Sequence, residues 1–307
     1  MAKLQNVTRA HLGLLLANLV WAVNYPFYKV LMPHYITPVA LATFAVTVAG
    51  LLGLVSLFWG GIEKIDRNDI YKFIGAALLM GIAKKLLLMI GMQHTSPIEA
   101  SIIATLGPIL VLVFSFFFGI DRFTPMKVFG MVLGMGGALL VILSGGGAVT
   151  SGEKLMGNLF VVGAIAASSF SMVWLKGLIM KYRPITVLRV YYPMAAVMLL
   201  PFGFDSMIHT DFAAMPAEAL WMFFYVILIP TFGPNYLLIF SLHYVKPTSS
   251  VFFYLQPVGA AILSVALHMD HLTWERVVGA LVVFAGVFFV VRSYKSTISS
   301  PMHQLDG

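Results

Sequence analysis

The chain has 307 residues, of which 60% are hydrophobic and only 10% are charged, whereas a soluble domain carries about 25% charged residues. This composition excludes an ordinary soluble domain and predicts an all-α polytopic membrane protein. The formal charge of +7 could suggest a nucleic-acid partner, but the basic residues are placed as in membrane loops, so we expect none. The absence of cysteine excludes disulfides and thiol redox chemistry.

Ten mostly apolar stretches, each about 20 residues long and so able to cross a bilayer, follow one another along the chain. They are expected at 11–32, 38–59, 70–91, 97–118, 125–144, 156–179, 185–203, 217–239, 248–268 and 275–293. The tail before the first stretch is short, polar and basic, and no cleavage site follows it. We therefore expect a first span and not a cleaved signal peptide.

The Gly145–Lys154 segment separates two halves of five spans each, and we expect domains at 1–147 and 148–307. The segment has some likeness to a phosphate-binding loop, but Glu153 stands where that motif needs lysine.

Lysine and arginine positions predict the orientation. With the N-terminus inside, cytosolic segments hold twelve of the nineteen basic residues, external segments hold two, and five lie in or near spans. Because basic residues favour the cytosolic side, we expect ten spans with both termini in the cytoplasm, in a bacterial inner membrane.

The two halves repeat each other at a shift of 149 residues. The matches include the pairs Ser101 and Ser250, Pro108 and Pro257, Asp121 and Asp270, Thr124 and Thr273, Gly130 and Gly279, and Gly137 and Gly286. Since each half has an odd number of spans, the second must enter the membrane upside down. The pattern predicts ten transmembrane helices as two inverted five-helix repeats, a transporter architecture with a midplane site between the repeats.

Three segments carry a family resemblance: Val20–Val30, Ser96–Ile142 and Lys246–Val291. They contain a Trp-small-x-Asn first span, prolines in the fourth and ninth spans, and acidic-x-x-Thr turns before glycine-rich spans. These features resemble the drug/metabolite transporter superfamily, specifically its EamA-like ten-helix group. The resemblance implies the fold and transport but says little about the substrate. The turn acids here are aspartates where the family usually has glutamate, and span two lacks an arginine that many members carry.

Lys84 and Lys85 lie inside the third span, without an acid in the same segment, and are not a general family feature. An ionisable residue at membrane depth costs roughly 2.5–3.5 kcal/mol on insertion scales. The pair therefore suggests a polar cavity and an anionic cargo. The alternative is that the lysines snorkel or pair structurally, with Glu99 as the nearest candidate partner.

The first span offers Trp21, Asn24, Tyr25 and Lys29 as cavity candidates. Trp21, Tyr25 and Lys29 are spaced by four and share one helix face. The family resemblance implies that this stretch faces the central cavity, and a packing role is the alternative.

The eighth span contains two prolines four residues apart, Pro230 and Pro234. The repeat shift places Gly233 and Pro234 where the lysines stand in the first half. We expect this span to be kinked or unwound, with freed carbonyl groups facing a cavity. A passive packing kink is the alternative.

Further gate or cavity candidates are a lysine of the first span, residues in spans six and seven, and two prolines at matching positions in the repeats. They are Lys29, Lys176, Arg189, Tyr192, Pro108 and Pro257. Snorkelling is the alternative for Lys176. The glycines Gly130, Gly134 and Gly137 indicate close helix packing or a dimer face.

All twelve acidic residues are expected in loops, tails or span ends, and no histidine lies at mid-membrane. This disfavours proton-coupled relay and cation export. We expect a secondary transporter or facilitator of a small organic metabolite that is anionic or carboxylate-bearing, such as an amino acid, organic acid or sugar phosphate. It would work by alternating access as a monomer or homodimer in the lipid bilayer, without cofactor or metal. A proton-coupled exporter of amphipathic compounds is the runner-up. A membrane sensor or enzyme remains a distant alternative, since no catalytic motif is present.

Overall fold

The structure is a computed structural model that describes residues 2–32, 34–59, 63–121, 124–143, 152–244 and 255–298. Most of the expected linker and the first residues of the ninth expected span lie outside these ranges. Every regular element in the described residues is helical, as the composition predicted.

The described helices follow the expected spans closely. In the first half they are α1 (Ala2–Leu31), α2 (Pro38–Val55), α3 (Ile70–Ala76), the π-helical segment η3 (Ala77–Ala83), α4 (Lys84–His94), α5 (Pro97–Ala104), α6 (Gly107–Phe117) and α7 (Pro125–Leu143). In the second half they are α8 (Gly152–Trp174), α9 (Lys176–Lys181), α10 (Pro184–Ile208), α11 (Ala217–Tyr244), α12 (Leu255–Ala266) and α13 (Trp274–Ile298).

Local sequence explains several helix starts. Thr37 and Ser96 accept hydrogen bonds from the backbone N–H groups of Ala40 and Glu99, and each is followed by a proline at the first helical position. A hydroxyl N-cap satisfies an otherwise unpaired N–H, and proline loses nothing there.

Eight helical stretches in the described residues are long and apolar enough to cross a membrane, against the ten expected. The stretch Arg67–His94 combines η2 (Arg67–Asp69), α3, η3 and α4, and Pro97–Phe117 combines α5 and α6. The ninth expected span corresponds to α12, which is apolar but shorter.

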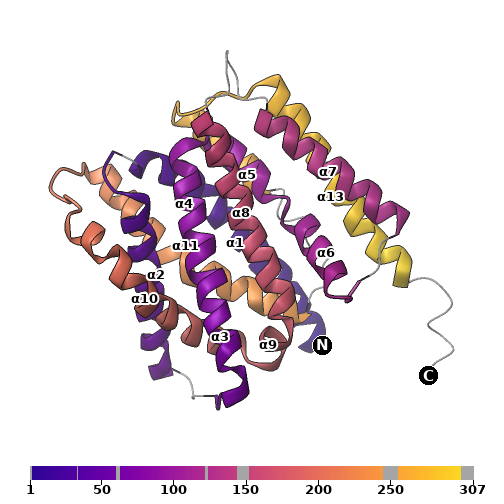
Figure 1. The fold of residues 1–307 in the computed structure, drawn as a ribbon, viewed down its shortest axis with the longest axis horizontal. Coiled ribbons are helices and arrows are strands. Elements are labelled where there is room, and N and C mark those ends of the chain that lie inside the picture. Colours follow the sequence, from indigo (N-terminus) through magenta and orange to yellow (C-terminus); the bar gives the residue numbers. More distant parts are fainter. Residues whose placement is uncertain are drawn as a thin grey trace.

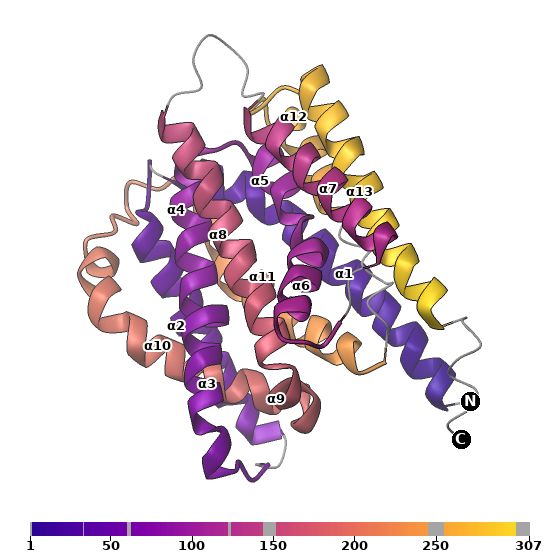
Figure 2. The same ribbon diagram turned by 45° about the vertical axis from the view of Figure 1, so that its right-hand side comes forward.

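Equivalent helices of the two halves make equivalent contacts, so the packing is exchanged between the halves. α2 packs against α10, and α7 against α13, which pairs the second spans and the fifth spans of the halves. α1 packs against α11 and α12, and α8 packs in the same way against α4 and α6. Figures 1 and 2 show α7 and α13 side by side along one flank of the bundle. This exchange fits a fold of two repeats.

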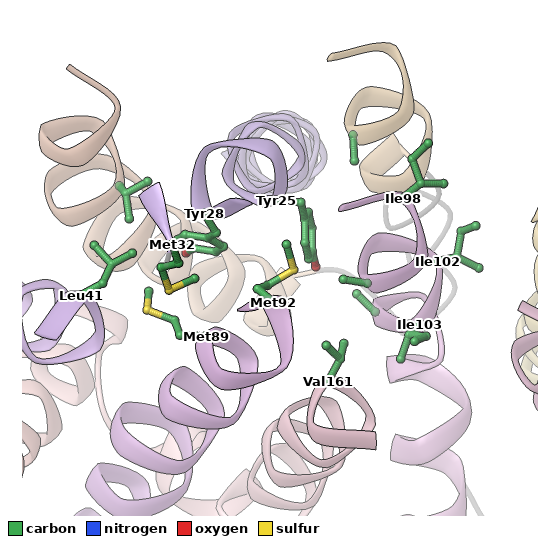
Figure 3. Packing of buried hydrophobic residues seen from close by; sticks show 14 of the residues in the cluster. Tyr25, Tyr28, Met32, Leu41, Met89, Met92, Ile98, Ile102, Ile103 and Val161 are labelled. Carbon is green, nitrogen blue, oxygen red and sulfur yellow. The ribbon is translucent and has the colours of Figure 1, made fainter. Parts of the chain in front are cut away.

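A buried core joins α1 to its neighbours beside the centre of the bundle. Figure 3 shows Tyr25 and Tyr28 of α1 beside Met89 and Met92 of α4, with Val161 of α8 close by. All five side chains are at most 5% exposed. The apolar packing fixes the helix face that carries the tyrosines.

The glycines of α7 bring it into close contact with α13. A Cβ atom added at Gly137 would lie 2.6 Å from the backbone nitrogen of Val283, and one added at Gly130 would lie 2.7 Å from the carbonyl oxygen of Gly286. Real Cβ atoms do not approach backbone this closely. These glycines therefore serve helix packing within the fold, one of the two alternatives expected from the sequence.

Two neighbouring glycines of α7 provide a direct test of this packing. We expect Gly137→Ala to destabilise the protein by about 1–3 kcal/mol, because α13 backbone blocks the new methyl group. Gly136→Ala is the control, since no atom lies within 4 Å of its added Cβ and it gains the same helix propensity. Thermal unfolding in detergent measures both, and equal midpoints for the two variants would contradict the prediction.

Of the kink or unwinding expected in the eighth span, the unwinding is wrong, because α11 is helical from Ala217 to Tyr244 through both Pro230 and Pro234. A helix break lies instead in the fourth span, where α5 ends at Ala104 and α6 begins at Gly107. Side chains satisfy the carbonyl groups of α11 at its prolines, since Trp21 donates to Pro230 O and Asn235 donates to Thr231 O.

Candidate functional site

A central cavity of about 630 Å³ lies between the two halves. Along α1 its wall extends from Leu14 to Tyr28. It continues to Ile120 after α6, Met180 of α9 and Leu242 near the end of α11. The cavity thus runs from the middle of the bundle towards the end at which α1 begins, which is the end marked N in Figure 2.

Lys84 and Lys85 both line this cavity. Lys84 Nζ lies 5.4 Å from the centre of the Trp21 ring. Lys85 Nζ lies 5.4 Å from the centre of the Tyr28 ring and donates hydrogen bonds to Tyr28 Oη at 3.1 Å and Thr231 Oγ1 at 3.3 Å. An ammonium over an aromatic face is attracted by the negative face of the ring. The Trp21 ring thus contacts the Lys84 ammonium, and a ring and two hydroxyls hold the Lys85 ammonium.

Neither lysine forms an ion pair with a carboxylate in the part of the chain that the structure describes. The expected partner Glu99 is wrong, since Glu99 binds Lys154 and Arg276 instead. The two positive charges therefore reach the cavity without a neutralising acid beside them, a costly arrangement at membrane depth.

The π-helical segment η3 ends directly before the lysine pair. Gly81 in η3 is buried against α10, where an added Cβ would lie 2.6 Å from the Cβ of Ala195. π-Helical turns are rare and often occur at functional sites. The spacing of apolar residues gave no sign of this segment.

Trp21 joins α1 to the proline pair of α11. Its Nε1–H donates to the carbonyl oxygen of Pro230 at 3.1 Å. In a regular helix that carbonyl would accept from the N–H of residue 234, but Pro234 has none. The indole thus supplies the missing donor, and the freed carbonyl expected from the sequence exists within an unbroken helix.

The next carbonyl of α11 is also bonded. Thr231 O accepts from Tyr192 Oη at 2.7 Å and from Asn235 Nδ2 at 2.6 Å. Pro230, Thr231, Asn235 and Tyr192 line the cavity, whereas Gly233 and Pro234 are not among the described lining residues.

Gln256, a buried amide that the sequence did not single out, also lines the cavity. Tyr25 Oη donates to Gln256 Oε1 at 3.2 Å, and Gln256 Nε2 donates to Asn18 Oδ1 at 2.6 Å. Asn24 also lines the cavity, and its Oδ1 is buried without a hydrogen-bond partner in the described residues. Amides inside apolar spans were the available signal, since each needs a partner there.

Other expected residues divide between the cavity and the surrounding packing. Pro108 and Lys176 line the cavity, and Lys176 is exposed on the side where α1 begins. Lys29 instead donates to the carbonyl oxygens of Met92 and Gln93, near the end of α4. Pro257 is buried but is not among the described lining residues.

Arg189 is also outside the cavity wall. It donates from Nε to Ser56 Oγ at 2.8 Å and from Nη2 to the Ser56 carbonyl oxygen, so it binds the chain directly after α2. A cation beside the end of a helix is favourable, since unpaired carbonyl groups gather there.

A buried charged cluster lies at the opposite end of the bundle. Glu99 is fully buried, and its Oε1 accepts from Arg276 Nη2 at 2.8 Å and from Lys154 Nζ at 2.8 Å. Its Oε2 accepts from Thr95 and Asn158, each at 3.3 Å. The carboxylate thus joins residues from both halves.

The repeat shift relates the ion pairs at the two ends. Arg276 Nη1 lies 2.5 Å from Asp270 Oδ1, and Lys127 Nζ lies 2.5 Å from Asp121 Oδ1. Each cation follows its acid by six residues, and 149 residues separate the pairs. Arg276 reaches across to Glu99 in addition.

A second cross-half cluster lies between η2 and α9. Lys181 forms ion pairs with Asp66 and Asp69, and Tyr182 Oη donates to Asp69 Oδ2 at 2.9 Å. The carboxylates of Asp66 and Asp69 raise the pKa of Lys181 above its ordinary value. The cluster ties the start of the third span to the turn before α10.

No group of three or more potential metal ligands occurs in the described ranges.

Comparison with known proteins agrees with this fold. A model of the EamA-like transporter family matches residues 8–143 and 155–292. An uncharacterized transporter of Archaeoglobus fulgidus is 25% identical over 261 residues, which cover 84% of this chain and 90% of that protein. The uncharacterized transporter YoaV of Bacillus subtilis is 24% identical over 292 residues, which cover 92% of this chain and 96% of YoaV. The crystal structure of another protein, 17% identical, matches 97% of this chain and 99% of its own with a TM-score of 0.65, which shows a shared fold.

Proposed function

The chain belongs to the EamA-like transporter family, and from this premise we propose that it carries a small anionic organic metabolite across the membrane by alternating access. The substrate class is a carboxylate or other organic anion. The protein acts as a secondary transporter or facilitator, alone or as a homodimer in the lipid bilayer.

The observation that carries this proposal is the lysine pair. Lys84 and Lys85 line a cavity of about 630 Å³ and have no ion-paired carboxylate in the described structure. A ring contacts Lys84, and a ring and two hydroxyls hold Lys85. A bound anion would supply the missing negative charge. Charge-assisted hydrogen bonds to a carboxylate or phosphate are about twice as strong as neutral ones.

The surrounding charges support alternating access. The cavity runs towards the end where α1 begins, whereas the Glu99 cluster joins the halves at the opposite end. With both termini in the cytoplasm of a bacterial cell, this state would admit substrate from the cytoplasm. Opening of the Glu99 cluster would then release it to the outside, with the repeats at 1–147 and 148–307 moving against each other.

A ligand screen on purified protein tests the charge of the substrate. Thermal unfolding would be followed with organic acids, sugar phosphates and amino acids, and with quaternary ammonium compounds as cationic controls. Binding to the native state at a hundred times Kd stabilises it by about 2.7 kcal/mol. We expect stabilisation by anions and none by cations, and the reverse would contradict the proposal.

Flux measurements in proteoliposomes then separate mechanisms. Anion uptake that does not change when a pH gradient is imposed would support facilitation or exchange. A steep dependence on the gradient would favour proton-coupled export instead.

A further inference from the structure

Asn24 differs from the other amides around the cavity. It is 4% exposed and lines the cavity, yet its Oδ1 has no hydrogen-bond partner in the described residues. By contrast, Asn18 Oδ1 accepts from Gln256 Nε2, and Asn235 Nδ2 donates to the Thr231 carbonyl oxygen. A buried acceptor without a donor is costly, so native structures leave few of them.

Asn24 lies on α1 between the two residues that contact the lysines. Trp21, Asn24 and Tyr28 are spaced by three and four residues, so they lie on one face of the helix. The Trp21 ring contacts the Lys84 ammonium, and the Tyr28 ring contacts the Lys85 ammonium. Asn24 therefore lies along α1 between the two contacts that position the positive charges.

The two lysine ammonium groups and the Asn24 amide oxygen require different hydrogen-bonding groups in a ligand. A lysine ammonium only donates hydrogen bonds, whereas an amide oxygen only accepts them. The ligand thus needs an anionic acceptor group for the lysines and a donor group nearby for Asn24. A charged amine is an unsuitable donor, since two ammonium groups would repel it and the cavity-lining acid, Asp121, is ion-paired with Lys127.

We propose that Asn24 is a specificity-determining residue that selects carboxylates bearing a neutral donor beside the acid, above all 2-hydroxycarboxylates. The hydroxyl donates to Asn24 Oδ1 while Lys84 and Lys85 hold the carboxylate. This inference rests on the proposed anion transport and narrows its substrate class.

Two probes that differ by one hydroxyl test the inference. Phenyllactate and 3-phenylpropionate share a carbon skeleton and a carboxylate, and only phenyllactate has the 2-hydroxyl. Their binding to the purified full-length protein would be measured by calorimetry. We expect wild-type protein to prefer phenyllactate by about tenfold, the effect of one net hydrogen bond.

Three variants complete the design. Asn24→Leu keeps the side-chain shape, and we expect it to lose the preference by weakening phenyllactate alone. Asn24→Ala provides the same test with a smaller side chain in case the leucine variant folds poorly. Asn235→Ala is the matched control, because it removes another cavity amide whose own bond is internal to α11, and it should keep the preference.

The outcomes separate this inference from the function on which it rests. Equal binding of both acids to wild-type protein, or a preference that survives in both Asn24 variants, would overturn the role of Asn24 and leave anion transport standing. Binding of neither acid at millimolar concentration, together with no stabilisation by any anion of the ligand screen, would overturn both.

Discussion

Replacement of both cavity lysines, Lys84→Met together with Lys85→Met, is expected to abolish anion uptake into proteoliposomes while the protein still folds. In the proposed function each ammonium would donate charge-assisted hydrogen bonds to the anion, and loss of one such bond costs roughly 1.5–3 kcal/mol, or about 10- to 150-fold in affinity. Methionine retains most of the side-chain length and removes the charge from membrane depth, so we expect stability to hold or rise.

Single substitutions at Lys84 and Lys85 should differ in the contacts that they remove. Lys85 is fixed by Tyr28 and Thr231, so Lys85→Met also frees two hydroxyls that face the cavity. Lys84 has only the Trp21 ring as its described contact, so Lys84→Arg should keep both charge and contact and retain substantial uptake.

Lys176→Met is the matched control, because it removes a positive charge from another part of the cavity wall. Lys176 is an exposed cavity-lining lysine towards the end where α1 begins, so its loss should slow entry modestly and leave anion affinity nearly intact. Wild-type uptake rates in the double methionine variant would refute the lysine site.

Glu99→Gln is expected to destabilise the protein by about 3–5 kcal/mol, the usual cost of breaking a buried ion pair by removing one partner. Glu99 is fully buried, and its loss of charge leaves Lys154 without its described acid and Arg276 with Asp270 alone. Thermal unfolding in detergent gives the size of the effect.

The control removes an acid from the exposed cluster at η2. Asp66→Asn breaks an ion pair whose side chains are 56% and 47% exposed, so the cost should be about 0–1 kcal/mol. Similar losses of stability for the two variants would contradict the assignment of Glu99 to a buried structural cluster.

A second measurement asks whether the Glu99 cluster closes its end of the bundle. Because the chain contains no cysteine, single cysteines placed beside α5 can be labelled without background. Labelling by a membrane-impermeant thiol reagent should become faster in Glu99→Gln than in Asp66→Asn, provided that the protein remains folded.

The features that the sequence revealed are those that depend on composition and periodicity. Apolar runs predicted the helices, and matched prolines and aspartates predicted the repeat. The rarity of charge in apolar segments singled out Lys84 and Lys85, which the structure places on the cavity wall.

The features that sequence reasoning missed depend on contacts between distant residues. Glu99 and Arg276 are 177 positions apart, and no local pattern pairs them. The proline rule predicted a kinked or unwound eighth span, but α11 continues as a helix and Trp21 satisfies the Pro230 carbonyl from another helix. The π-helical η3 likewise has no signature in the spacing of apolar residues.

The ion pair between Arg276 and Glu99 affects which orientation the proposed carrier prefers when no substrate is bound. The repeat shift carries Arg276 onto Lys127 and Asp270 onto Asp121, but it carries Glu99 onto Thr248, which has no charge. If the protein alternates between two orientations as proposed, these would be unequal in energy, and each 1.4 kcal/mol of difference would shift their populations tenfold. A substrate that binds only the less populated orientation has its apparent affinity reduced in proportion to the population of that orientation. A passive carrier built in this way would show two half-saturation concentrations, one for each face of the membrane.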